Sequence, residues 1–178
     1  VADEIAKLKE EINRYDVEIV YNMDETGLFY KLLPNHSYVK SDHRKNAQGI
    51  KLMKAKDHVT LFISTNAMGN DKVPLCLIGK SKKPRCFNNG PPWLKYFSQK
   101  KAWSDSKVFQ QWWEFFHKNH IRLKTSDKVL SIMDNCGSHG SEIMDPYNQV
   151  KVVFLPPNVT SMYQPNSGGV IAMVKKNY

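Results

Sequence analysis

The sequence predicts a single α/β domain with a mixed sheet of five strands flanked by helices. Three short runs rich in β-branched residues precede the one strongly amphipathic helix, and two more runs follow it. Each run is bounded by Gly, Pro, Asn or charged residues, as strands usually are. A chain of 178 residues with 41% hydrophobic residues is long enough to bury a core under such a sheet.

The composition indicates which partners and which cellular environment suit the chain. Lysine and arginine number 26 against 17 aspartate and glutamate, a formal net charge of +9. This excess favours a polyanionic partner such as nucleic acid, although solubility alone also explains it. The three cysteines form no C-x-x-C pair, so neither a disulfide framework nor a structural zinc site is predicted. The sequence shows no signal peptide and no apolar run of ~18 residues, which predicts a cytosolic or nuclear protein with no membrane partner.

The chain opens with a predicted amphipathic helix. Residues 2–14 are charge-rich and carry apolar residues at helical spacing. We assign residues 1–15 to an N-terminal helix or linker and residues 16–178 to one core domain. The core begins with a predicted strand, Val17–Met23, that runs into Asp24, so an acid is expected at this strand's end.

A basic loop and a hairpin are predicted next. Residues 31–56 are polar, basic and without periodicity, which indicates a long loop or ragged hairpin that either follows phosphates or is simply solvated. His58–Ala67 and Val73–Gly79 are predicted strands, and the Gly and Asn of Met68–Asp71 suit a hairpin turn between them. With the first strand they form an antiparallel meander. Lys80–Arg85 then makes a second basic cluster.

The strongest helix prediction covers Trp103–Asn119. Ser104 is the expected N-cap, with Trp103 and Val108 as a hydrophobic staple. Valine, phenylalanine and tryptophan residues form a wide apolar face along this segment. A face of this kind is typical of a helix that packs on a sheet rather than of a base-stacking platform.

The functional prediction begins at Val129–Met133. This apolar run is too short for a buried helix and has polar flanks, so it predicts a buried strand that ends on Asp134. A desolvated carboxylate is costly unless it binds a cation or several donors, and open α/β sheets place ligands at such strand ends. An N-cap or turn aspartate beside Asn135 explains the same acid equally well. Val150–Leu155 is the last predicted strand, and a helix is expected to begin at Gln164–Pro165.

This element order is that of the ribonuclease H-like fold, in which acids from different elements converge. Six segments carry a more specific likeness: Asn22–Gly27, Thr60–Gly69, Ile78–Phe87, Lys101–Trp103, Asp134–Asn135 with His139, and Leu155–Ser161 with Gln164–Pro165. In order and spacing they closely resemble the pogo/Tigger branch of the DDE transposase superfamily, which includes Jerky-like and centromere-protein-B-like host proteins. The resemblance covers nearly the whole chain from about Tyr21 onward.

The resemblance implies a DDE endonuclease or transposase core that cuts and rejoins DNA with two Mg²⁺ or Mn²⁺ ions held by three acids. By resemblance Asp24 is the first acid, the one that bridges both ions, and Asp134 is the second. Hard cations favour carboxylate oxygens, and two of them ~3.5–4 Å apart clamp the attacking and leaving oxygens of a phosphodiester. DNA is then the partner and the nucleus the expected location, with a homodimer as a further candidate assembly.

The third acid is where the sequence departs from the family. The family reads Gln-Pro-x-Asp-x-Gly-Val-Ile, whereas this chain has Ser167 at the position of the acid in Gln164–Ile171. The conceivable substitutes, none favoured by spacing, are Asn166, Glu25, Glu142 and Asp145. We therefore favour a decayed or domesticated element over an intact enzyme.

Two functions stay open at this stage. The first is a DDE-type core that is catalytically impaired, and the second is a domesticated, non-catalytic DNA-binding or protein-interaction module. The helix-turn-helix domains that the family carries upstream are missing, so we expect a core fragment that ends within its last helix and does not itself read DNA sequence. The expected phosphate contacts, which are sequence-independent and salt-dependent, are Lys80, Lys82, Lys83 and Arg85.

Overall fold

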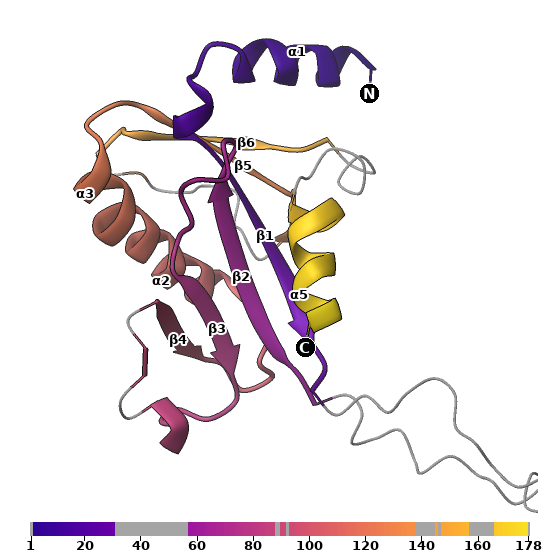
Figure 1. The fold of residues 1–178 in the computed structure, drawn as a ribbon, viewed down its shortest axis with the longest axis vertical. Helices are drawn as coiled ribbons and strands as arrows, with labels where there is room; N and C mark the ends of the chain where they lie inside the picture. Colours follow the sequence, from indigo (N-terminus) through magenta and orange to yellow (C-terminus); the bar gives the residue numbers. More distant parts are fainter. Residues whose placement is uncertain are drawn as a thin grey trace, which may run out of the picture.

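The computed structural model describes residues 2–30, 57–87, 90–91, 93–137, 145, 147–156 and 166–177. These residues form a mixed sheet of six strands in the order β4-β3-β2-β1-β5-β6 (Figure 1). The strands are β1 (Val20–Leu28), β2 (Val59–Asn66), β3 (Leu75–Gly79), β4 (Leu94–Ser98), β5 (Val129–Met133) and β6 (Val150–Phe154). β1 lies between the antiparallel strand β2 and the parallel strand β5, so it joins the two halves of the sheet.

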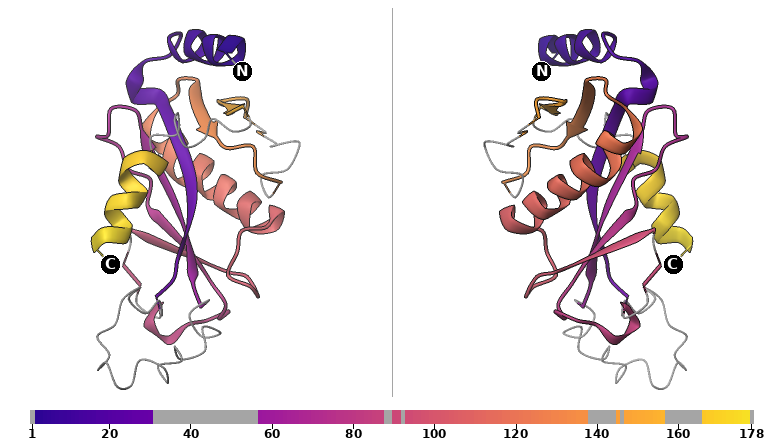
Figure 2. Two further views of the ribbon diagram at one scale, coloured as in Figure 1. Left: turned by 90° about the vertical axis from the view of Figure 1, so that its right-hand side faces the viewer. Right: turned by 90° about the vertical axis from the view of Figure 1, so that its left-hand side faces the viewer.

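Helices cover both faces of the sheet. On one face, α2 (Ser106–Phe116) continues through a π-helical turn, η5 (His117–Ile121), into the short α3 (Arg122–Lys124). On the other face, the π-helical turn η7 (Asn166–Val170) leads into α5 (Ile171–Asn177), as Figure 2 shows. α1 (Ala2–Ile12) packs through Leu8 against β5. Two short 3₁₀ turns complete the described elements: η1 (Val17–Ile19) and η4 (Arg85–Phe87).

The larger core lies between α2 and the sheet. Trp112 stacks on Phe116 with ring centroids 5.3 Å apart and meets Phe62 of β2 edge-on at 5.5 Å. The N-cap lies one residue later than expected, because Asp105 rather than Ser104 accepts the Val108 N–H, at 2.9 Å. The N-cap prediction was therefore wrong.

The predicted fold class is confirmed, with two corrections to its elements. The sheet has six strands rather than five, because Leu94–Ser98 pairs in parallel with β3 at the sheet edge. In addition, Asp24 lies inside β1 and not at its end, since pairing with β2 continues to Leu28. A Cβ at Gly27 would lie 3.2 Å from the Trp103 ring, a tight contact, so this strand position suits glycine.

Some predictions fall on residues that the structure does not describe. These are the basic loop 31–56 and the start of the last helix at Gln164–Pro165. Of the helices that are described, none has the length and apolar character needed to cross a membrane.

Candidate functional site

Asp24 is presented by the central strand on the face that α5 covers. It pairs in register with Ile63, and Ile63 packs with Ile171 of α5. The side chain is 6% exposed, and its Oδ1 accepts the backbone N–H of Glu25 at 2.7 Å. A buried carboxylate needs donors or a cation to offset its desolvation, and the Glu25 N–H is one such donor.

Asp134 follows directly on the neighbouring parallel strand β5. The ladder between β1 and β5 ends with the pair Asn22 and Ile132, so Asp24 and Asp134 each lie two residues beyond this last pair. Adjacent strands lie about 4.8 Å apart, which is close enough for two carboxylates to share a ligand. The Asn22 side-chain amide donates to the Ile132 carbonyl at 3.1 Å and adds a further link between the two strands at this point.

Asn166 anchors the turn η7, which precedes α5, to strands β1 and β2. It is 1% exposed, its backbone N–H donates to Asn22 Oδ1 at 3.2 Å, and its Nδ2 donates to the carbonyls of Asn22 and Ile63 at 2.9 and 3.1 Å. Thr65 completes the set by donating its hydroxyl to Asn166 Oδ1 at 3.2 Å. The backbone of Ser167 therefore follows a residue anchored across β1 and β2, beside the strand that carries Asp24.

The same contacts decide among the possible substitutes for the third acid. The amide of Asn166 is engaged by the strand backbones, so sequence reasoning recognised the residue but missed its positioning role. Glu25 pairs with Phe62, which belongs to the core under α2, and so lies on the opposite face from Asp24. Asp145 closes the turn before β6, at the end of that strand remote from Asp134. Glu142 lies outside the described residues.

The described residues fit a divalent ion only in part. Carboxylate oxygens on neighbouring strands are the donors that Mg²⁺ and Mn²⁺ prefer. Within the described ranges, however, no group of three or more His, Cys, Asp or Glu side chains could hold a metal ion. By the resemblance of its motif, the family would carry the third acid at residue 167, which is a serine in this chain.

The predicted basic cluster lies after β3, on the far side of the sheet from β5. Lys80 is ion-paired with Asp57 at 2.7 Å, so part of its charge is offset, whereas Lys83 and Arg85 are exposed. Lys82 lines a groove of about 490 Å³ together with Lys95 of β4 and Lys118 of η5. Sequence reasoning missed these last two residues, because only the folded chain brings them beside Lys82.

A tyrosine holds this basic segment in place. Tyr96 donates its hydroxyl to the Ser81 carbonyl at 2.6 Å, and its ring stacks on Phe87 at 4.9 Å. Gly79 makes room for the contact, since a Cβ there would lie 2.6 Å from the Tyr96 hydroxyl.

The comparisons with known proteins show the family and the fold of the chain. The family model for the DDE superfamily endonuclease matches residues 56–178, more than half of the chain. The chain belongs to this family. Its relatives include Tigger transposable element-derived protein 4 of Mus musculus, which is 29% identical over 168 residues, and CENP-B homolog protein 2 of Schizosaccharomyces pombe, which is 32% identical over 187 residues. The pogo/Tigger branch recognised from the motifs is therefore confirmed.

These matches cover nearly all of this chain but only part of each relative. They cover 94% and 99% of this chain but 31% and 34% of the two relatives, so the chain spans about a third of their length. Among solved structures, the Mos1 transposase paired-end complex with left transposon end has a TM-score of 0.59 at 11% identity, over 97% of this chain and 46% of that one. This likeness shows the fold alone. Nucleases of the DDE superfamily generally use divalent metals.

Proposed function

We propose that this chain is the DNA-binding core of a DDE-type endonuclease or transposase whose cleavage is impaired because Ser167 replaces the third acid. Asp24 and Asp134 are its two remaining metal-binding carboxylates. The observation that supports the proposal is the parallel pairing of β1 with β5, whose last pair, Asn22 and Ile132, lies two residues before each acid. A divalent ion held by Asp24 and Asp134 would lower the pKa of an attacking hydroxyl and stabilise the leaving oxygen.

Each remaining polar residue of the site has a positioning task. Asn22 links β1 to β5, and Asn166 ties the turn before α5 to β1 and β2. Together they fix residue 167 relative to Asp24 before any ligand binds, which is how a preorganised site avoids the cost of ordering. The scaffold for a third ligand is thus retained, although the ligand itself is changed.

Loss of one carboxylate weakens the hold on metal substantially. At ~4 Å and an effective dielectric of ~20, one pair of unit charges is worth on the order of 4 kcal/mol before desolvation. Even half of that corresponds to a tenfold or greater loss of affinity. A serine hydroxyl carries no charge and does not replace it.

Several observations support DNA as the partner. The net charge of +9 and the groove lined by Lys82, Lys95 and Lys118 suit a phosphate backbone. A solved structure that shares the fold is the Mos1 transposase paired-end complex with left transposon end. We extend this to a nuclear protein with residues 16–178 as its core, and we expect weak, sequence-independent and salt-dependent binding.

The test is a titration of Mn²⁺ by calorimetry into the parent protein, Ser167→Asp and Ser167→Asn. Asparagine matches the shape of aspartate without its charge, so only Ser167→Asp should gain affinity, by tenfold or more. Equal affinities in all three proteins would remove residue 167 from the metal site. A plasmid-nicking assay completes the test: if the parent nicks DNA with metal and Asp24→Ala abolishes nicking, the impaired assignment is wrong.

The alternative function is a domesticated, non-catalytic DNA-binding or protein-interaction module. The Ser167 substitution is the observation that favours it. Nicking separates the two functions, because a core that has lost only one acid regains metal-dependent cleavage in Ser167→Asp. A module that has lost further catalytic features does not, even when Mn²⁺ binding is restored.

A further inference from the structure

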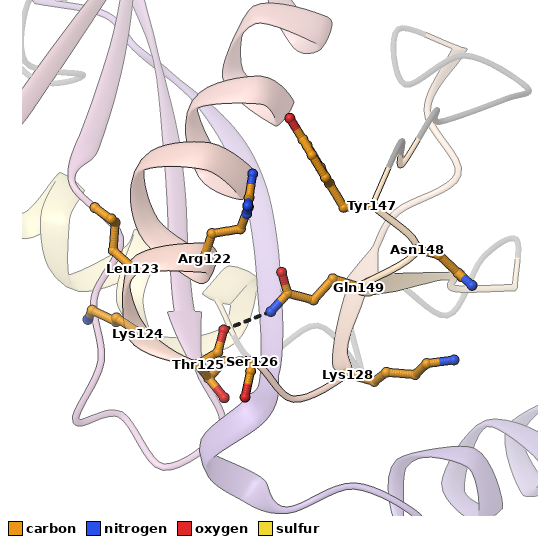
Figure 3. A pocket seen from close by; sticks show the side chains of 9 residues that line it. All are labelled: Arg122, Leu123, Lys124, Thr125, Ser126, Lys128, Tyr147, Asn148 and Gln149. Carbon is orange, nitrogen blue, oxygen red and sulfur yellow. Dashed lines mark hydrogen bonds between the residues drawn. The ribbon is translucent and has the colours of Figure 1, made fainter.

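An open pocket of about 690 Å³ lies at the opposite end of β5 from Asp134, between the end of α3 and the turn before β6 (Figure 3). Three cations line it: Arg122, Lys124 and Lys128. None of the described residues that line the pocket is an acid. Its chemistry therefore favours an anion.

Hydrogen bonds within the protein hold the walls of the pocket together. Asp145 accepts the backbone N–H groups of Tyr147 and Gln149 at 3.0 and 2.6 Å, which closes the turn before β6. The Gln149 side chain then donates to the Thr125 carbonyl at 2.8 Å and joins this turn to the end of α3, as Figure 3 shows. Because its walls are already ordered, the pocket loses little conformational entropy when it binds an anion.

The three cations are not equivalent. The Arg122 guanidinium lies 4.4 Å from the centroid of the Tyr147 ring, so the pocket wall holds it in place. Lys124 is ion-paired with Asp71, which offsets part of its charge. The exposed Asp127 lies beside the pocket, where it accepts the hydroxyl of Thr125 at 3.2 Å. Arg122 and Lys128 are therefore the residues on which anion binding depends most.

We propose that this pocket binds a phosphate of a DNA backbone, at a contact separate from the Asp24 region. A guanidinium held against the Tyr147 ring, in a pocket that Lys128 also lines, suits a phosphate, which takes two N–H donors from arginine and a point charge from lysine. The Tyr147 ring is already covered by Arg122, so a phosphate fits the pocket better than a stacked base does. The proposal rests on DNA binding by the chain, as proposed above.

The position of the pocket defines which DNA segment it contacts. The pocket is lined by residues of α3, which continues from α2, whereas Asp24 lies on the face of the sheet that α5 covers. Figure 2 shows these helices on opposite faces of the sheet. The segment held at Arg122 and Lys128 is therefore not the one whose phosphodiester lies at the carboxylates.

The test measures the affinity for a labelled duplex at 50 and 200 mM salt in the parent, in Arg122→Ala/Lys128→Ala and in Lys100→Ala/Lys107→Ala. The last variant removes the same charge from exposed lysines outside both basic regions. Each phosphate contact adds ~0.9 to the salt slope, so loss of two should shrink the ratio of the two affinities by about 12-fold. Arg122→Lys keeps the charge but not the planar stacking group and should retain most of the slope.

The outcomes separate this proposal from the one on which it rests. A parent protein that binds no DNA overturns both. A parent that binds, with the pocket variant matching the Lys100→Ala/Lys107→Ala control, overturns the pocket alone. If folding of Arg122→Ala fails, Lys128→Glu replaces it, and an unchanged salt slope in that variant equally overturns the pocket.

Discussion

The two faces of β1 carry opposite chemistries on alternate residues. Tyr21 and Met23 point into the core under α2, where Tyr21 meets Phe116 edge-on at 5.5 Å. Asn22 and Asp24 are equally buried but belong to the polar face, where amides and a carboxylate replace rings. One strand therefore serves stability on one side and the candidate site on the other, because strand side chains alternate with a period of two.

The difference between the faces shows how a buried polar site is tolerated. The apolar face gains free energy from area removed from water, and it needs no partner geometry. On the polar face, burial is unfavourable unless each group is paired, and Asn22 and Asn166 meet this demand through mutual hydrogen bonds. Disrupting each face should therefore give a distinct result.

Removing the largest ring of the apolar face should give the largest effect. Trp112 is 1% exposed among Phe62, Phe109 and Phe116, so Trp112→Ala should lower the free energy of unfolding by about 3–5 kcal/mol. Gln110→Ala, an exposed change in the same helix, is the control and should stay within about 0.5 kcal/mol. Urea denaturation measures both. A loss below about 1 kcal/mol would show that α2 does not hold the core.

On the polar face, Asn166→Ala should cost less. It leaves two strand carbonyls without their side-chain donor, which predicts a loss of about 1–3 kcal/mol. Hydrogen exchange of α5 amides should rise more than that of α2 amides, since Asn166 anchors only the α5 side. Asn177→Ala removes an exposed asparagine hydrogen bond within α5 and is the matched control. Equal exchange changes in both helices would mean that the faces are not independent.

Periodicity predicted most of the fold, and the exceptions have physical causes. β5 was predicted with its observed bounds because Val129–Met133 is apolar throughout and clearly flanked. β4 was missed because Leu94–Ser98 is short, follows a stretch of prolines and glycine, and becomes a strand only by pairing with β3. The first strand was predicted to begin three residues too early, since Val17–Ile19 forms the 3₁₀ turn η1. It was also predicted to end too early, because the polar segment from Asp24 owes its strand form to pairing with β2.

The candidate site could be located from sequence only through its motifs. No periodicity predicts that the strands before Asp24 and Asp134 are neighbours, since this depends on a parallel pairing between distant segments. Asn22 and Asn166 lie inside the recognised motifs, yet their mutual hydrogen bonds are visible only in three dimensions. The pocket at Arg122 was not predicted either. Its cations lie on either side of the turn between α3 and β5, and only the folded chain brings them together with Tyr147.

At the margin of the apolar face, a polar cluster should make stability depend on pH. Burial lowers the pKa of His120, and its hydrogen bond with Asp71 opposes this only in part. Burial alone would raise the pKa of the Asp71 carboxyl, but hydrogen bonds from Lys124, Tyr21 and His120 bring it below its usual range. His117 behaves like His120, with burial lowering its pKa against the pull of Asp145.

Both histidines should destabilise the fold as the pH falls. Their folded pKa values lie below the unfolded value of about 6.5, so the unfolded chain takes up protons first. Stability is then full above about pH 6.5 and declines below it, until the folded histidines also protonate. Asp71 acts in the same direction but only below about pH 4, so the interval from pH 7.5 to 5 isolates the histidines.

This pH dependence is the smallest of the three effects. It tests the difference between the two faces of the sheet, since only the α2 side carries these histidines. His120→Gln keeps an N–H donor toward Asp71 without titrating, so its free energy of unfolding should decline less between pH 7.5 and 5 than that of the parent. Urea denaturation at both pH values, with Asn177→Ala on the α5 side as control, measures the difference. A parent that becomes more stable at pH 5, or a His120→Gln protein with an undiminished decline, would show that the environment of His120 does not disfavour its protonation.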